Sequence, residues 1–125
     1  MQGADLARKA AELLYDRKAR DILALKVDHL MVLTDYLVLA TGANALQTHA
    51  LMEHLDQGLS ALGVVPRRVE GQQASRWIVM DYGSVIVHIF HPEDREFYRL
   101  ERLWTDGSNR LPLPFEDEGK DKTGI

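Results

Sequence analysis

Residues 77–91 read WIVMDYGSVIVHIFH, and this stretch decides the fold class. Two runs that are rich in β-branched and aromatic side chains, 77–81 and 85–90, are separated by a Tyr-Gly-Ser triplet. Such runs are typical of strands, and a short glycine-containing turn between them is typical of a β-hairpin. The stretch therefore predicts two antiparallel strands joined by a tight turn.

The chain before this hairpin shows a regular alternation of helix and strand patterns. Helices are expected at residues 6–17 and 46–62, and strands at residues 21–27, 36–40 and 64–69. Asn44, with Gln47 three positions later, is suited to cap the second helix, and Gly63 is suited to end it. Because Pro66 has no backbone N–H, the last of these strands is expected at a sheet edge.

The chain after the hairpin begins with a helix signal and ends in a polar segment. Pro92 suits the first position of a helix, and Glu93 and Asp94 follow in the first turn, where the helix dipole favours anions. We expect one helix that ends at Gly107. Residues 111–125 contain prolines and acidic side chains but few large apolar side chains. We therefore expect a flexible acidic tail after a single domain of residues 1–110.

The order of these elements is helix, two strands, helix, three strands and helix. A strand, helix, strand crossover followed by a hairpin implies a mixed sheet of about five strands flanked by helices. The fold class is therefore α/β (α+β), and the element order resembles the nucleotidyltransferase fold.

Composition excludes several function classes. The 125 residues include 15 Lys and Arg against 19 Asp and Glu, a formal net charge of -4, which argues against direct nucleic-acid readout through a basic surface. The chain has no cysteine, so disulfides, thiolate metal sites and a cysteine nucleophile are excluded. No apolar run approaches the ~20 residues that span a bilayer. We expect a cytoplasmic protein without a membrane contact.

The histidines are poorly spaced for a metal site. His88 and His91 are three residues apart around a strand, which places them on opposite faces, and His49 and His54 are five apart on a helix. Zinc sites on a helix use a spacing of four. We expect no metal ligand, and we interpret His88 as a hydrogen-bonded histidine on the sheet.

The carboxylates do not form a catalytic pair either. A nucleotidyltransferase holds Mg²⁺ with two strand-borne acids separated by one residue, and no predicted strand carries Asp-x-Asp or Asp-x-Glu. We therefore expect no catalytic residue and no cofactor. The enzyme hypothesis that stays open is nucleotide binding at an unusual site around Asp35, Thr41 and Asp81.

Aromatic residues are concentrated in residues 77–104, which hold six of the nine. Along the first hairpin strand, alternation puts Trp77 and Asp81 on one face and Tyr82 on the other. In the last helix we expect Phe97, with Leu100 and Trp104, to face the core, and Tyr98, Glu101 and Arg102 to lie nearer the surface. Trp and Tyr beside a charged residue are common anchors of protein recognition, which favours a protein interface.

Four ordered segments resemble the ribosomal silencing factor family, whose members are also called Iojap-like proteins. They are residues 34–42 (TDYLVLATG), 69–71 (VEG), 77–91 and 95–104 (REFYRLERLW). The resemblance implies a non-enzymatic protein with a nucleotidyltransferase-like fold. It further implies a translational repressor that binds the large ribosomal subunit through ribosomal protein fourteen, blocks joining of the small subunit and silences ribosomes under nutrient limitation.

The resemblance also assigns binding residues by motif. The family's exposed positions on the hairpin and the last helix would contact the ribosomal protein. In this chain they are Trp77, Asp81, Tyr82, Tyr98, Glu101, Leu103 and Trp104. Asp81 and Glu101 would pair with Arg or Lys of the partner. The chain departs from the family pattern at residues 43–46, at residues 72–75 and at Ser84. A possible homodimer of the free protein, which would hide part of the aromatic face, is a further hypothesis.

Overall fold

The computed structural model describes residues 1–115, so positions 116–125 of the tail predicted at 111–125 lie outside the described residues. The elements are α1 (Gly3–Asp16), β1 (Arg20–Lys26), β2 (Tyr36–Thr41), α2 (Ala45–Ser60), β3 (Arg68–Glu70), β4 (Trp77–Asp81), β5 (Val85–Phe90), α3 (Pro92–Tyr98) and α4 (Leu100–Trp104). Within the described part of the chain, every helix is too short or too polar to cross a bilayer.

The five strands form one mixed sheet in the order β1-β2-β5-β4-β3. β2 and β5 run parallel, and the other neighbouring pairs are antiparallel. The predicted hairpin pairs in the register Trp77↔Phe90 to Asp81↔Ile86. The predicted class, a mixed sheet of five strands flanked by helices, is confirmed.

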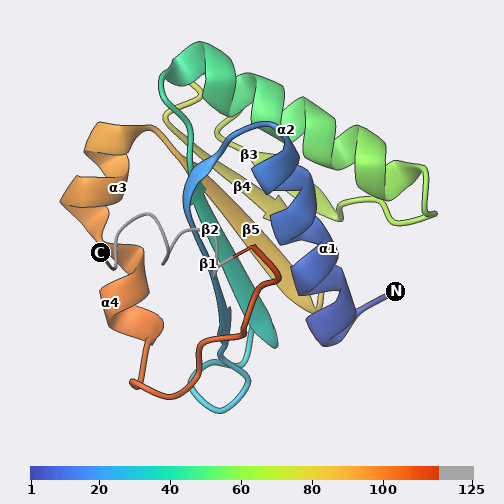
Figure 1. Cartoon of the computed structure of the whole chain (residues 1–125), viewed down its shortest axis with the longest axis vertical. Helices are drawn as coiled ribbons and strands as arrows, with labels where there is room; N and C mark the ends of the chain where they lie inside the picture. Colours follow the sequence, from blue (N-terminus) through green and yellow to red (C-terminus); the bar gives the residue numbers. More distant parts are fainter. Residues whose placement is uncertain (116–125) are drawn as a thin grey trace.

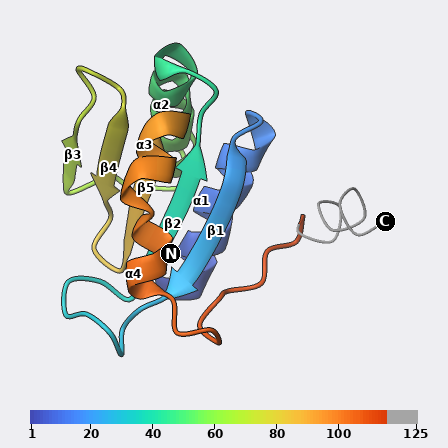
Figure 2. The same ribbon diagram turned by 90° about the vertical axis from the view of Figure 1, so that its left-hand side faces the viewer.

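The sheet separates two helical layers (Figures 1 and 2). α1 and α2 cover one face, where they bury the main core with side chains of all five strands, although β3 contributes only the half-buried Val69. Val38, Met80 and Val87 are among the fully buried members of this core. α3 and α4 lie across the opposite face, over a smaller second core of Leu25, Val27, Leu37, Leu39 and Phe90. Because β1, β2 and β5 are covered on this side and β4 and β3 are less so, part of the sheet face stays open.

Local signals set most of the element boundaries. The Asn44 side chain accepts a hydrogen bond from the Gln47 backbone N–H at 2.9 Å, as the capping pattern predicts. Gly63 has a φ of 80°, the left-handed conformation in which helices commonly end. β3 is only three residues long and forms an edge of the sheet, in agreement with the position of Pro66.

The predicted last helix is interrupted, which corrects the expectation of one continuous helix. Arg99 adopts a left-handed conformation with φ 46° and ψ 50°, and this residue separates α3 from α4. A residue in this conformation changes the direction of the chain, so one helical stripe cannot describe both halves. As a result Phe97 is 79% exposed and does not face the core, whereas Leu100 and Trp104 pack against the second core.

The predicted tail begins too early. Leu111 and Leu113 are buried in the main core, and Phe115 stacks on Tyr15 with ring centroids 4.2 Å apart. The segment is fixed along the outer edge of β1, where the Leu111 N–H donates to Ala24 O at 2.8 Å. The alternation of leucine with proline in residues 111–114 suits an extended strap with one apolar side, which overall composition hides.

Candidate protein-binding surface

An aromatic cluster lies at one end of the sheet, on the face that carries α3. It consists of Trp77 on β4, His88 and Phe90 on β5, and Tyr98 on α3. The Trp77 ring centroid lies 5.0 Å from that of Phe90 and 4.7 Å from that of Tyr98. Phe90 is buried and Trp77 half-buried, while Tyr98 is 47% exposed, so the cluster runs from the core to the surface.

A hydrogen bond fixes the orientation of the Trp77 indole. Its Nε1–H donates to His88 Nδ1 at 3.0 Å. An indole nitrogen can only donate, so Nδ1 carries no proton in this arrangement. Burial lowers the pKa of His88 to about 4, which keeps the ring neutral near pH 7. The interpretation of His88 as a hydrogen-bonded histidine on the sheet is confirmed.

A buried arginine joins α3 and α4 to the sheet. Arg95 Nη1 donates to Thr41 Oγ1 at 2.9 Å, and its Nε donates to Glu101 Oε1 at 3.1 Å. The guanidinium carbon also lies 6.0 Å from the Phe90 ring centroid. Glu101 was expected to pair with a partner cation, but it already forms this internal ion pair across the Arg99 break.

The open part of the sheet continues from the aromatic cluster along β4 and β3. Pairing puts Asp81 beside Arg68 and Val79 beside Glu70 on this face. Asp81 Oδ1 accepts a hydrogen bond from the Gly83 N–H at 2.8 Å, so this half-buried carboxylate also orders the hairpin turn. The surface therefore has an aromatic end and a charged end.

Of the predicted binding residues on the last two helices, Leu103 is 69% exposed and Trp104 is half-buried. Together with Tyr98 and Phe97 they give this side an apolar exterior. The sequence reasoning missed Phe97 because it extended the helical stripe through Arg99. Helical periodicity gave no signal for an exposed Phe97, because the break at Arg99 leaves no mark in the apolar pattern of the sequence.

Tyr82 is not an exposed anchor, and that expectation is wrong. Its ring is 8% exposed in the main core, on the face opposite Trp77. Burial, with a smaller contribution from Asp56, raises the pKa of its hydroxyl. The alternation of the strand had already placed it on the other face, and the exposure implied by the family motif does not hold here.

The residues of the nucleotide-binding hypothesis do not converge. Thr41 pairs with Phe90 at one end of the sheet, while Asp81 pairs with Ile86 near the other end, roughly 13 Å away along the strand direction. Asp35 precedes β2 at the Asp81 end, and Thr41 is engaged by Arg95. Within residues 1–115, no group of three or more His, Asp or Glu side chains could hold a metal ion.

The family model described as ribosomal silencing factor during starvation matches residues 2–124. The chain belongs to the ribosomal silencing factor family. The matched span includes both helical layers, the whole sheet and the strap at the edge of β1.

Relatives support this membership over most of the chain. The ribosomal silencing factors of Halalkalibacterium halodurans and Bacillus subtilis are 31% and 32% identical over 85% of this chain and 91% and 90% of their own lengths. A mouse protein named mitochondrial assembly of ribosomal large subunit protein 1 is 36% identical over 74% of this chain and 42% of its own.

Solved structures show the same fold for this silencing factor chain. A crystal structure of a Chromobacterium violaceum protein matches with a TM-score of 0.81 at 30% identity, over 91% of this chain and 97% of that one. A Bacillus halodurans structure matches with a TM-score of 0.76 at 29% identity, over 87% and 98%.

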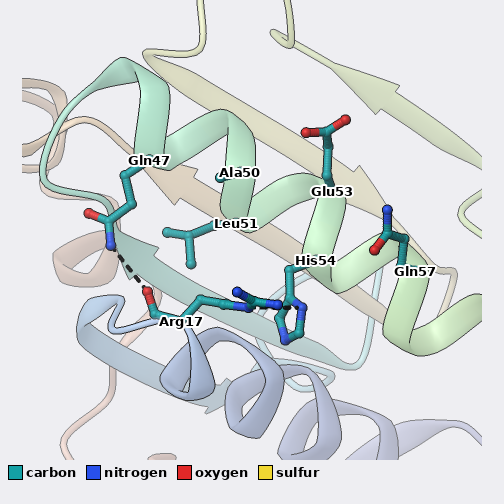
Figure 3. Close-up of a pocket in the computed structure, with 7 residues that line it drawn as sticks. All are labelled: Arg17, Gln47, Ala50, Leu51, Glu53, His54 and Gln57. Carbon is teal, nitrogen blue, oxygen red and sulfur yellow. Dashed lines mark hydrogen bonds between the residues drawn. The ribbon is translucent and has the colours of Figure 1, made fainter.

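The silencing factor chain also has a hollow between α1 and α2, away from the aromatic cluster (Figure 3). The Arg17 side chain lies across it and donates from Nε to His54 Nδ1 at 3.3 Å, while Gln47 Nε2 donates to the Arg17 carbonyl at 3.1 Å. These two bonds tie the end of α1 to α2. We interpret the hollow as a polar seam between helices.

Proposed function

We propose that this protein is a non-enzymatic translational repressor that acts in the cytoplasm. It binds the large ribosomal subunit through ribosomal protein fourteen, sterically blocks joining of the small subunit, and so silences ribosomes under nutrient limitation. The observation that carries the proposal is the surface formed by Trp77, Tyr98 and Leu103 in a chain of the silencing factor family. The name of the mouse relative, which refers to the large ribosomal subunit, points to the same particle.

The anchors have the properties of binding hot spots. Trp77 and Tyr98 are rigid aromatic side chains in contact with each other, and the hydrogen bond to His88 holds the indole in place. An aromatic side chain that is already ordered loses little rotamer entropy when a partner covers it. Asp81 adds a partly exposed negative charge, which suits a basic protein partner.

The test is cosedimentation with purified large and small subunits, measured separately. The parent is expected to bind the large subunit alone. Tyr98→Ala and Leu103→Ala are expected to weaken binding by tenfold or more each, the loss typical of an interface anchor. Leu46→Ala is the matched control for Leu103→Ala, because Leu46 is a leucine at least as exposed as Leu103 and lies at the start of α2, on the opposite layer.

A second measurement addresses the mechanism. Subunit reassociation, followed on sucrose gradients, is expected to fall with added parent protein and to recover with Tyr98→Ala. Parent protein that binds the large subunit but leaves reassociation unchanged would contradict steric exclusion. Sedimentation velocity of the free protein tests the homodimer hypothesis separately.

A further inference from the structure

We propose that the loop between β1 and β2 extends the docking surface beyond α4 and binds an apolar patch with a basic rim on the same ribosomal partner. This inference rests on the proposed function. The apolar loop is defined by four consecutive residues, Leu30, Met31, Val32 and Leu33.

The apolar loop presents its side chains to solvent. Val32 is fully exposed, Leu33 is 81% exposed and Leu30 is 40% exposed. Only Met31 turns inward, where it packs against the second core. Single exposed apolar residues are ordinary on a protein surface, but a consecutive group held in one place is typical of an interaction site.

The apolar loop is held at both of its ends by hydrogen bonds to the backbone. On one side, the backbone N–H groups of Leu30 and Met31 both donate to Val27 O at 2.9 Å. On the other side, Thr34 Oγ1 donates to Gly83 O at 2.9 Å. The apolar side chains are therefore presented by an anchored loop that has less conformational entropy to lose on binding.

A histidine–carboxylate contact connects this loop to the segment that follows α4. His29 Nε2 lies 2.7 Å from Asp106 Oδ2, and its Nδ1 lies 3.3 Å from Asp28 Oδ1. A carboxylate only accepts, so an imidazole between two carboxylates satisfies both when it is protonated. Figures 1 and 2 both show the loop beside the C-terminal end of α4, which carries Leu103. The apolar loop and the proposed interface are therefore continuous.

The charges around the apolar loop select the kind of partner. Three exposed carboxylates, those of Asp28, Asp35 and Asp106, lie around it, with His29 between two of them and Arg102 of α4 as the neighbouring exposed cation. If a second copy of this chain docked through the same loop, the carboxylates of one copy would lie against those of the other. A basic protein surface would instead complement these carboxylates and cover the apolar centre.

The test replaces the two most exposed side chains of the loop. In equilibrium binding to purified large subunits, the Val32→Ser/Leu33→Ser protein is expected to bind at least tenfold more weakly than the parent, with an unchanged circular dichroism spectrum. The matched control is Leu46→Ser/Leu62→Ser, which removes two exposed leucines near the two ends of α2 and is expected to bind like the parent.

The outcomes separate the two proposals. Unchanged binding by the loop variant, when Tyr98→Ala binds weakly, overturns the inference and leaves the proposed function standing. Failure of the parent to bind large subunits overturns the proposed function, and the inference falls with it. If the loop variant changes only self-association of the free protein in sedimentation velocity, the loop is a contact between copies and the inference is wrong.

Discussion

Replacing His88 with glutamine should remove much of the acid sensitivity of this protein. His88 is neutral in the folded protein because burial lowers its pKa from 6.5 to about 4. In the unfolded chain the ring is solvated and binds a proton near its ordinary pKa. The unfolded state therefore takes up a proton before the folded state does, and folding stability falls as the pH decreases from 6.5 toward 4. His88→Gln keeps an acceptor for the Trp77 indole but does not titrate.

The magnitude follows from the two pKa values. One pKa unit corresponds to about 1.4 kcal/mol, so the lowered pKa of His88 changes the free energy of unfolding by about 3 kcal/mol over the whole titration. Between pH 7.5 and pH 5 the change in this free energy is about 2 kcal/mol. His29 acts in the opposite direction, since its contacts with Asp106 and Asp28 raise its pKa. That contribution is present in both proteins and cancels in their difference.

Urea unfolding followed by tryptophan fluorescence provides the assay, with parent and His88→Gln each measured at both pH values. The parent should lose about 2 kcal/mol more of its free energy of unfolding than the variant does between about pH 7.5 and pH 5. Equal losses in the two proteins would refute the reasoning, because they would mean that His88 titrates alike in the folded and unfolded states.

Three further substitutions test the fold by urea unfolding. Gly71→Ala should cost about 3 kcal/mol, because Gly71 has a φ of 84° and a Cβ there would overlap the Trp77 carbonyl oxygen; a loss under about 1 kcal/mol would contradict this. Leu113→Ala should cost about 2 to 3 kcal/mol, whereas the exposed control Leu103→Ala should stay within about 0.5 kcal/mol; similar small losses would show that the strap is not part of the core. Tyr82→Phe should leave stability unchanged or raise it by up to about 1 kcal/mol, because its buried hydroxyl has no hydrogen-bond partner among the described residues; a clear loss would indicate a partner for that hydroxyl.

Much of the candidate surface could be predicted because it depends on strand alternation. The placement of Trp77 and Asp81 on one face of β4 needs only the period of two along a strand, and the pairing in the sheet agrees with it. The same rule puts Tyr82 on the opposite face, where it is buried. The expectation that Tyr82 is exposed was wrong because a family motif was given more weight than the local geometry.

The rest of the surface depends on contacts between residues that are far apart in the chain. The ion pair that engages Glu101 exists because the left-handed Arg99 turns α4 back toward Arg95. The apolar loop becomes part of the same side of the molecule because His29 meets Asp106, 77 residues away. Neither contact has a periodic signature in the sequence.

The sequence by itself determined the order of strands and helices, the hairpin, the cap at Asn44 and the edge position of β3. Each of these follows from backbone preferences and side-chain periodicity within a few residues. Only the tertiary structure decided that the last helix breaks at Arg99 and that the segment around Leu113 joins the core. The physical reason is that both depend on which apolar surface is left uncovered after the sheet has formed, and that is a property of the whole fold.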